Sequence, residues 1–193
     1  MKHKVSNRII SVLLTLVMVV GLIPSTVIPI HAINIKGTIS ASVLNDNVGV
    51  VLVADTKLNM DTDLTVPYIE GDYNLTIQGS GKLTVNGSGN GIDVKSLTCY
   101  SDLFIQTGWH AIEVTDTVYI QNAYAFINGG IYADGDIDIY CNDATITGNG
   151  NAISGTGGDI TLSGGTFDIG ANGVMSLLRL LRPLGKNRIL SRP

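Results

Sequence analysis

The middle of this 193-residue chain contains no arginine and very little lysine. Residues 33–176 hold 4 lysines and all 16 acidic residues of the chain, which gives this region a formal charge of −12. Domains that bind nucleic acid neutralise its phosphates with lysine and arginine. The composition therefore excludes nucleic acid as a partner of this region.

The N-terminal segment lacks the cysteine of a lipoprotein signal, so the sequence does not support a lipid anchor. Residues 1–32 combine a basic start, an apolar stretch and a small final residue, which is typical of a signal peptide. The alternative is a retained membrane anchor. Pro24, Pro29 and an apolar core of about 15 residues, against the ~20 that span a bilayer, favour the signal peptide. We therefore expect a secreted or cell-surface protein that meets a membrane only through this segment before cleavage.

The chain that follows the N-terminal segment contains an internal repeat. A small residue followed by an aliphatic one recurs at intervals of 20, 19, 22 and 21 residues, starting at Gly91-Ile92. Two further apolar columns precede this one in each repeat, and they begin at Leu75 and at Leu83. We number the three columns in chain order, so that the first begins at Leu75, the second at Leu83 and the third at Ile92. Their i, i+2 pattern indicates three short strands per repeat of about 21 residues.

Three short strands in so few residues cannot enclose a core, so each repeat must stack on its neighbours. Segments rich in Gly, Asn, Asp and Ser separate the strands and are typical of turns. The sequence therefore predicts an all-β fold, a parallel β-helix in which each coil lies ~4.8 Å from the next.

The repeat also divides the chain. We expect β-helix coils over residues 74–175, and an N-terminal cap with a first irregular coil over residues 33–73. Residues 176–193 form a basic, leucine-rich tail that departs from the repeat. The tail is either a basic amphipathic helix or a stretch in which the native frame is lost near Met175. We favour the second interpretation, because the repeat stops within a coil and leaves the stack truncated at its C-terminal end.

The two cysteines, Cys99 and Cys141, fall two coils apart in this register. Two rungs separate them by ~9.6 Å, which exceeds the ~7 Å limit for the Cα atoms of a disulfide. Cys99 takes the place of an inward aliphatic residue. We therefore predict no disulfide and a buried Cys99.

Several short segments of the repeat resemble those of known proteins, notably LTIQGSGKLTV, NGI and DITLSGGTF. Through these segments residues 48–175 resemble the carbohydrate-binding β-helix domains of secreted and cell-surface proteins from Gram-positive anaerobic bacteria, which have a pectate-lyase-like fold. The resemblance implies a right-handed β-helix within a larger surface protein. It also implies a plant-type polysaccharide as partner, and Ca²⁺ held by acidic residues at the edges of the coils.

Aromatic residues stand in the outward rows between the inward columns. The register predicts that Phe104 and Phe126 are neighbours on adjacent rungs, and that three tyrosines share one face. Sugar rings stack on flat aromatic faces, so these rows are candidate carbohydrate-binding surfaces. The candidates are Tyr100, Tyr119, Tyr140, Phe104, Phe126 and Trp109. Aromatic pairs also stabilise a sheet without any ligand, and for the two phenylalanines we favour that role.

Acidic residues form a second group of candidates. Asp93 and Glu113 are expected one rung apart, where like charges repel unless a cation joins them. Calcium prefers six to eight oxygen ligands of this kind. The candidate ligands, four of them at the turn from the third column to the first, are Asp93, Glu113, Asp116, Asp134, Asp136 and Asp159. The alternative is that single carboxylates keep the edges soluble, and the absence of a DxDxDG loop favours it.

Catalysis is the least supported of the functions that this fold hosts. The polysaccharide lyases with this fold resemble one another in using an arginine or lysine base together with bound Ca²⁺. The coils of this chain have no arginine. Asp136 and Asp138 flank the inward Ile137 and so point into water, which leaves no buried carboxyl as a general acid. His110 is interpreted as a polar turn residue. We expect a non-catalytic carbohydrate-binding module, with a structural shaft or adhesin segment as the alternative and a lyase-like enzyme as the second.

Overall fold

The computed structural model describes residues 32–148, 152–169, 174–176 and 188–191. The expected signal peptide, except its last residue, lies outside the described residues. The chain divides after Ile30, and all that follows concerns the second unit, His31–Pro193.

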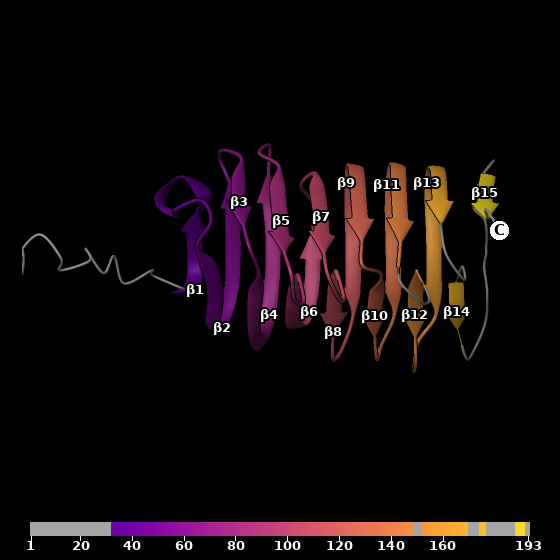
Figure 1. Cartoon of the computed structure of the whole chain (residues 1–193), viewed down its shortest axis with the longest axis horizontal. Coiled ribbons are helices and arrows are strands. Elements are labelled where there is room, and N and C mark those ends of the chain that lie inside the picture. Colours follow the sequence, from indigo (N-terminus) through magenta and orange to yellow (C-terminus); the bar gives the residue numbers. More distant parts are fainter. Residues whose placement is uncertain (1–31, 149–151, 170–173, 177–187, 192–193) are drawn as a thin grey trace, which may run out of the picture. The chain divides into compact units, whose positions relative to one another are not determined.

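This unit is a right-handed parallel β-helix of about 7 turns, as the sequence predicted (Figure 1). Every strand pairing in the described part of the chain is parallel. A 3₁₀ helix, η1 (Ala41–Val43), follows the first strand. The strands are β1 (Ala32–Ser40), β2 (Gly49–Met60), β3 (Leu64–Val66), β4 (Ile69–Gly79), β5 (Leu83–Gly87), β6 (Ile92–Cys99), β7 (Leu103–Thr107), β8 (Ile112–Val114), β9 (Val118–Asn128), β10 (Ile131–Ala133), β11 (Ile137–Thr147), β12 (Ile153–Gly155), β13 (Ile160–Ile169), β14 (Val174–Ser176) and β15 (Arg188–Ser191).

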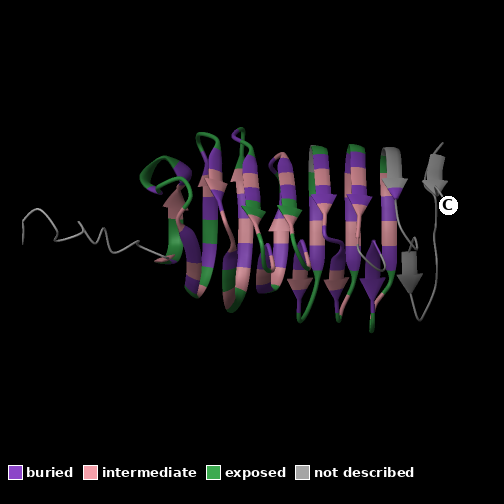
Figure 2. Cartoon of the chain, viewed as in Figure 1, coloured by how far each residue is buried: buried purple, intermediate pink, exposed green. Residues whose placement is uncertain are grey.

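The three apolar columns are confirmed as the core. In the second column, Leu83 of β5 pairs with Leu103 of β7, and Leu103 pairs with Ala125 of β9. These side chains are fully buried, and the residues between them are partly exposed, as the alternating colours of Figure 2 show. Inward aliphatic side chains therefore stack from rung to rung and supply most of the buried apolar surface that drives folding.

The strands themselves are longer than the three short ones per coil that we expected. β2, β4 and β6 run from the third column through the corner into the first, and β9 and β11 run from the first column into the second. Glycine permits some of these corners. Gly71 (φ +142°) and Gly79 (φ +122°) are examples, and a Cβ on either would lie 2.5 Å from a backbone carbonyl oxygen of the neighbouring rung.

The stack also extends beyond the boundaries expected from the repeat. β1 pairs with β2, and β2 pairs with β4, so residues 33–73 continue the parallel ladders. In the tail, β15 pairs with β13 from Thr166↔Arg188 to Ile169↔Ser191. One segment of the basic tail is therefore a strand that continues the second column. Residues 177–187 and 192–193 lie outside the described residues.

Cys99 is buried and no disulfide joins it to Cys141, as predicted; Cys141, whose burial was not predicted, is buried as well. Burial raises the pKa of the Cys99 thiol to about 12, because the thiolate would lose its hydration. Among the described residues, no helix is long and apolar enough to cross a membrane.

Candidate functional site

The outward row beside the third column carries three acidic residues on consecutive rungs. Glu70 of β4 pairs with Asp93 of β6, and Asp93 pairs with Glu113 of β8. We call Glu70, Asp93 and Glu113 the acidic row. The predicted neighbours Asp93 and Glu113 are thus confirmed, whereas Glu70 was missed because residues 33–73 were assigned to an irregular coil. The pair Ile69-Glu70 has the inward–outward pattern of Ile92-Asp93, and that pattern could have revealed it.

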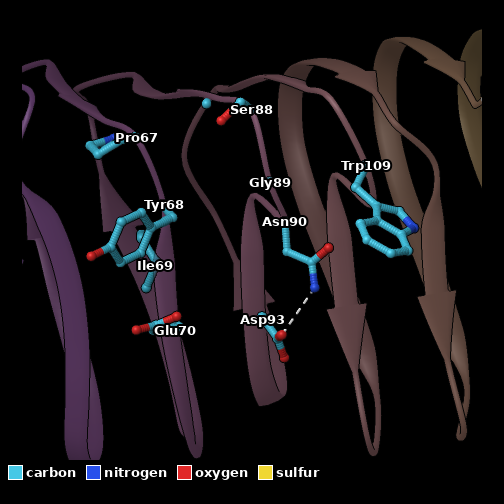
Figure 3. Close-up of a pocket in the computed structure, with 10 residues that line it drawn as sticks. Pro67, Tyr68, Ile69, Glu70, Ser88, Gly89, Asn90, Asp93 and Trp109 are labelled. Carbon is cyan, nitrogen blue, oxygen red and sulfur yellow. Dashed lines mark hydrogen bonds between the residues drawn. The ribbon is translucent and has the colours of Figure 1, made fainter.

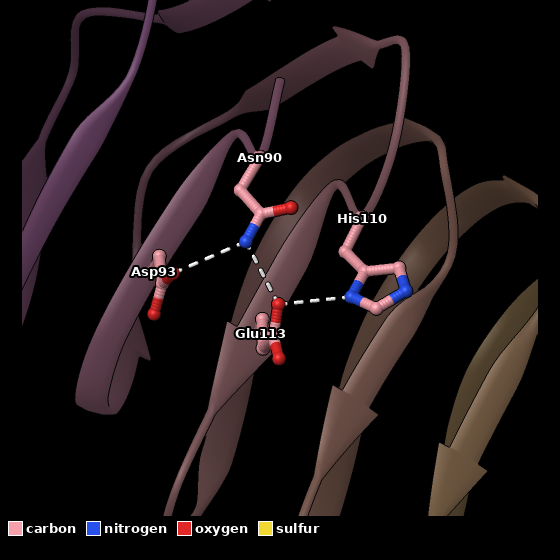
Figure 4. Close-up of polar contacts among 4 residues, drawn as sticks. All are labelled: Asn90, Asp93, His110 and Glu113. Atoms are coloured by element: carbon pink, nitrogen blue, oxygen red, sulfur yellow. Dashed lines mark hydrogen bonds and ion pairs between the residues drawn. The ribbon is translucent and has the colours of Figure 1, made fainter.

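Asn90 and His110 hold part of this row in place (Figure 4). The Asn90 amide nitrogen donates to Asp93 Oδ2 at 3.1 Å and to Glu113 Oε2 at 2.8 Å, and His110 Nδ1 lies 2.9 Å from the same Glu113 oxygen. The His110 ring also stacks on Tyr132, with ring centroids 4.0 Å apart. Asn90 and His110 occupy equivalent positions in successive coils, each three residues before its acidic partner. His110 is therefore a polar turn residue, as interpreted from the sequence.

A hollow of about 520 Å³ opens beside the acidic row (Figure 3). Tyr68 and Trp109 stand on either side of Asn90 and Asp93, and Glu70 lies below Tyr68. We call this hollow the Trp109 groove. Its remaining lining residues are Pro67, Ile69, Gly87, Ser88 and Gly89.

A second hollow, of about 450 Å³, shares Glu70 and Asp93 with the Trp109 groove. It is lined further by Val51, Gly71, Asp72, Val94 and Thr115. The two hollows thus meet at two carboxylates of the acidic row, which lie where they can contact a ligand in either one.

Backbone contacts between rungs position Trp109. The backbone N–H of Gly108 donates to Gly87 O at 3.2 Å, and that of Trp109 donates to Gly89 O at 3.3 Å. A side chain at Gly108 would overlap the carbonyl of Ser88, so only glycine allows this close approach. The indole is left 66% exposed, more than any other large hydrophobic side chain among the described residues. The loop is therefore held by its backbone while the ring stays accessible.

On the Tyr68 side of the groove, too, a glycine is needed. A Cβ on Gly49 would overlap the ring of Tyr68, so the absence of a side chain at residue 49 makes room for that ring. Gly89, in contrast, has open space around its missing side chain, with no heavy atom within 4 Å of the Cβ position. The groove is thus rimmed by two aromatic rings and has a glycine-containing loop at its edge.

The three tyrosines predicted to share a face do so, but they do not line the Trp109 groove. Ring centroids are 5.9 Å apart for Tyr100 and Tyr119, and 5.6 Å apart for Tyr119 and Tyr140. The rings are tilted by 59° and 44°, so they do not form one flat platform. The Tyr119 hydroxyl donates to Gln121 Oε1 at 2.9 Å. Desolvation, aided by the charge of Asp138 and by Tyr119, raises the pKa of Tyr140.

Phe104 and Phe126 are rung neighbours, as predicted. Their rings stack with centroids 4.6 Å apart and an interplanar angle of 12°. Each ring therefore uses one flat face on the other, which agrees with a role in stabilising the sheet.

The remaining acidic candidates, Asp116, Asp134, Asp136 and Asp159, lie at the turn from the third column to the first, as expected, and the carboxylates of the first three contact protein groups. Asp116 Oδ2 accepts from the Ser96 hydroxyl at 3.1 Å, and Asp134 Oδ1 accepts from the Thr156 hydroxyl at 2.7 Å. Asp136 Oδ1 accepts from the backbone N–H of Asp159 at 2.8 Å. Within the described ranges, no three His, Cys, Asp or Glu side chains gather as a metal-binding group. Calcium binding stays a prediction.

Other aspartates at the corners also accept hydrogen bonds from protein groups of a neighbouring rung, which the repeat pattern does not predict. The carboxylates of Asp46, Asp55, Asp63 and Asp102 each accept a backbone N–H from the next rung, at 2.8 to 3.1 Å. Hydrogen bonds from Asn74 lower the pKa of Asp55, and those from Ser42 lower the pKa of Asp61. Much of the negative charge thus satisfies backbone donors at the corners.

The fold and the site define a parallel β-solenoid. It has a polar groove, rimmed by the aromatic rings of Tyr68 and Trp109, beside its third column. Comparisons of the chain with protein-family models, with curated proteins and with solved structures found no match.

Proposed function

We propose that this protein is an exported, non-catalytic carbohydrate-binding module that holds an extended polysaccharide in the Trp109 groove. The observation that carries the proposal is the hollow of about 520 Å³, in which a 66% exposed Trp109 stands across from Tyr68 with polar groups between them. A sugar offers C–H faces to aromatic rings and hydroxyls to carboxylates and amides.

The polar groups of the groove suit hydroxyl recognition. The Asn90 amide nitrogen donates hydrogen bonds to Asp93 and Glu113, which leaves the side-chain carbonyl oxygen as an acceptor. A carboxylate offers about four acceptor positions, so Asp93 keeps most of its capacity for a ligand. These groups stand on neighbouring rungs, and a chain of sugars running along the stack could meet a similar set of contacts at each rung.

The Trp109 groove is a better candidate than the two other aromatic rows. The phenylalanine rings cover each other, and the tyrosine rings are tilted against one another outside any described hollow. Only Trp109, among the six aromatic candidates of the sequence, lines either of the two hollows.

Binding is favoured over catalysis by the exposure of the acidic row. A glycoside hydrolase needs a buried carboxyl that stays protonated as general acid. The Glu113 side chain is 41% exposed and lies in a hydrogen-bonding network with Asn90 and His110. A lyase needs an arginine or lysine base, and neither residue type lines the groove.

The test is a retention assay of the full chain on insoluble cellulose and on immobilised polygalacturonate, each with calcium and with EDTA. We expect Trp109→Ala to weaken retention roughly tenfold, because the ring's stacking energy is about 1 kcal/mol or more. Gly89→Leu should weaken it as well, since a Cβ at residue 89 has no heavy atom within 4 Å and the longer side chain would occupy the groove. Loss of retention in EDTA would support the calcium prediction.

Tyr100→Ala is the matched control, because Tyr100 is 47% exposed and lies outside the groove. If Tyr100→Ala lost retention and Trp109→Ala kept it, the site would belong to the tyrosines. If the folded chain were retained on neither polymer, the proposal would fail for these ligands and a structural shaft would be favoured.

A further inference from the structure

We infer that the Trp109 groove selects uncharged polysaccharides and rejects polyuronates. This inference rests on the proposed function and concerns the chemical class of the glycan. It differs from the calcium-bridged plant polyuronate that the sequence resemblance allows.

The charges of the groove have one sign. The three carboxylates of the acidic row lie on consecutive rungs, and two of them, Glu70 and Asp93, line both hollows. Asp72 lines the second hollow as well. No lysine or arginine lines either hollow, and within the described part of the chain no lysine forms an ion pair with these carboxylates. A ligand in either hollow therefore meets the carboxylates of Glu70 and Asp93, with no lysine or arginine among the lining residues.

A polyuronate carries one carboxylate on each sugar. Consecutive rungs place the protein's carboxylates ~4.8 Å apart along the stack. A uronate chain lying along the groove would bring its own carboxylates within a few ångströms of Glu70 and Asp93. Like charges at such distances repel, and both partners would also lose hydration on binding.

An uncharged polysaccharide has no carboxylates to be repelled by the acidic row. Its hydroxyls are hydrogen-bond donors, and hydrogen bonds to ionised acceptors are stronger than those between neutral groups. Glu70 accepts no hydrogen bond given by the described residues, and Asp93 accepts one, from Asn90. The acidic row therefore offers acceptors that hydroxyls can use and that uronate carboxylates cannot.

Calcium could reverse this selection, because a divalent cation can join a protein carboxylate to a uronate. The described residues contain no group of three acidic or other ligating side chains suited to a metal ion. We therefore expect the preference for uncharged polysaccharide to hold in calcium as well as in EDTA.

The experiment compares retention of the full chain on insoluble cellulose and xylan, both uncharged, with retention on immobilised polygalacturonate. We expect wild type to bind an uncharged polymer at least about tenfold more tightly, which corresponds to about 1.4 kcal/mol. The double variant Glu70→Gln/Asp93→Asn should narrow that ratio by raising retention on polygalacturonate. Asp143→Asn is the matched control, because it removes the same type of charge from an exposed corner outside both hollows.

Three results would overturn the inference. They are equal or tighter binding of polygalacturonate in EDTA, a reversal of preference when calcium is added, and an unchanged ratio in the double variant. In each of these the chain still binds a polysaccharide, so the proposed function stands. Absence of retention on all three polymers by the folded chain would instead refute the proposed function, and this inference with it.

Discussion

Shortening Ile105 tests how strongly the inward columns stabilise the stack. The Ile105 side chain is fully buried and lies between Val85 on one neighbouring rung and Ile127 on the other, both also fully buried. Ile→Val substitutions in cores cost about 0.5–1.5 kcal/mol, and Ile→Ala substitutions about 2–5 kcal/mol. Parallel ladders fix the backbone on both sides of Ile105, so the rungs cannot collapse into the space that alanine leaves. We therefore expect about 1 kcal/mol for Ile105→Val and about 3–5 kcal/mol for Ile105→Ala.

Urea unfolding followed by circular dichroism measures these changes in the free energy of unfolding, provided that the m-value stays constant. Val43→Ala is the control, because Val43 is 64% exposed and its substitution should stay within about 0.5 kcal/mol. An Ile105→Ala variant as stable as Val43→Ala would refute the reasoning, since it would mean that the second column is not tightly packed at this rung.

Two further predictions concern the thiols and the acidic corners. Cys99 and Cys141 should resist a thiol-specific reagent at about pH 8 in the folded protein and react fully in denaturant, because both are buried. Burial also raises the pKa of Cys99 to about 12, so little reactive thiolate forms there. Fast reaction of either thiol in the folded protein would contradict its burial. The pKa values of Asp55 and Asp61 are lowered in the folded state, so their contribution to stability is present above the ordinary value of 3.8 and is lost as the pH falls through the folded-state pKa values. The free energy of unfolding should therefore decrease from about pH 6 to pH 3, and it should decrease less in Asp55→Asn/Asp61→Asn; an equal decrease in that double variant would contradict the assignment.

The fold could be predicted from the sequence because the inward columns leave a regular trace. A side chain that must pack on its equivalent in the next coil recurs once per coil, and Leu83, Leu103 and Ala125 show that spacing directly. The same register predicts Asp93 beside Glu113 and Phe104 beside Phe126, and both pairs are confirmed. Contacts that follow from the register alone were therefore predictable.

The strand boundaries were less predictable, because they depend on the corners. β9 continues from the first column into the second, whereas β6 ends at Cys99 and β7 begins at Leu103. The corner inside β9 has four residues (121–124), whereas the strand breaks at corners of three residues (100–102) and of five residues (78–82), so corner length does not distinguish a continuous strand from a break. The corner aspartates raise the same difficulty. Whether a carboxylate accepts a backbone N–H of the next rung, as Asp63 does, depends on side-chain conformation that no periodicity records.

The groove could not be predicted for a related reason. Its walls are Tyr68 and Trp109, which lie outside the columns in segments that vary from coil to coil, and its shape depends on Gly49 and Gly108. The aromatic rows that the register predicts are poorer binding surfaces, because Phe104 and Phe126 stack on each other and the tyrosine rings are tilted against one another. Sequence periodicity thus identifies the residues that build the stack, whereas a ligand needs residues that the stack leaves unused. In this protein those residues line one hollow, in which the exposed Trp109 ring and two carboxylates of the acidic row are open to a ligand, and the function that we propose depends on this combination.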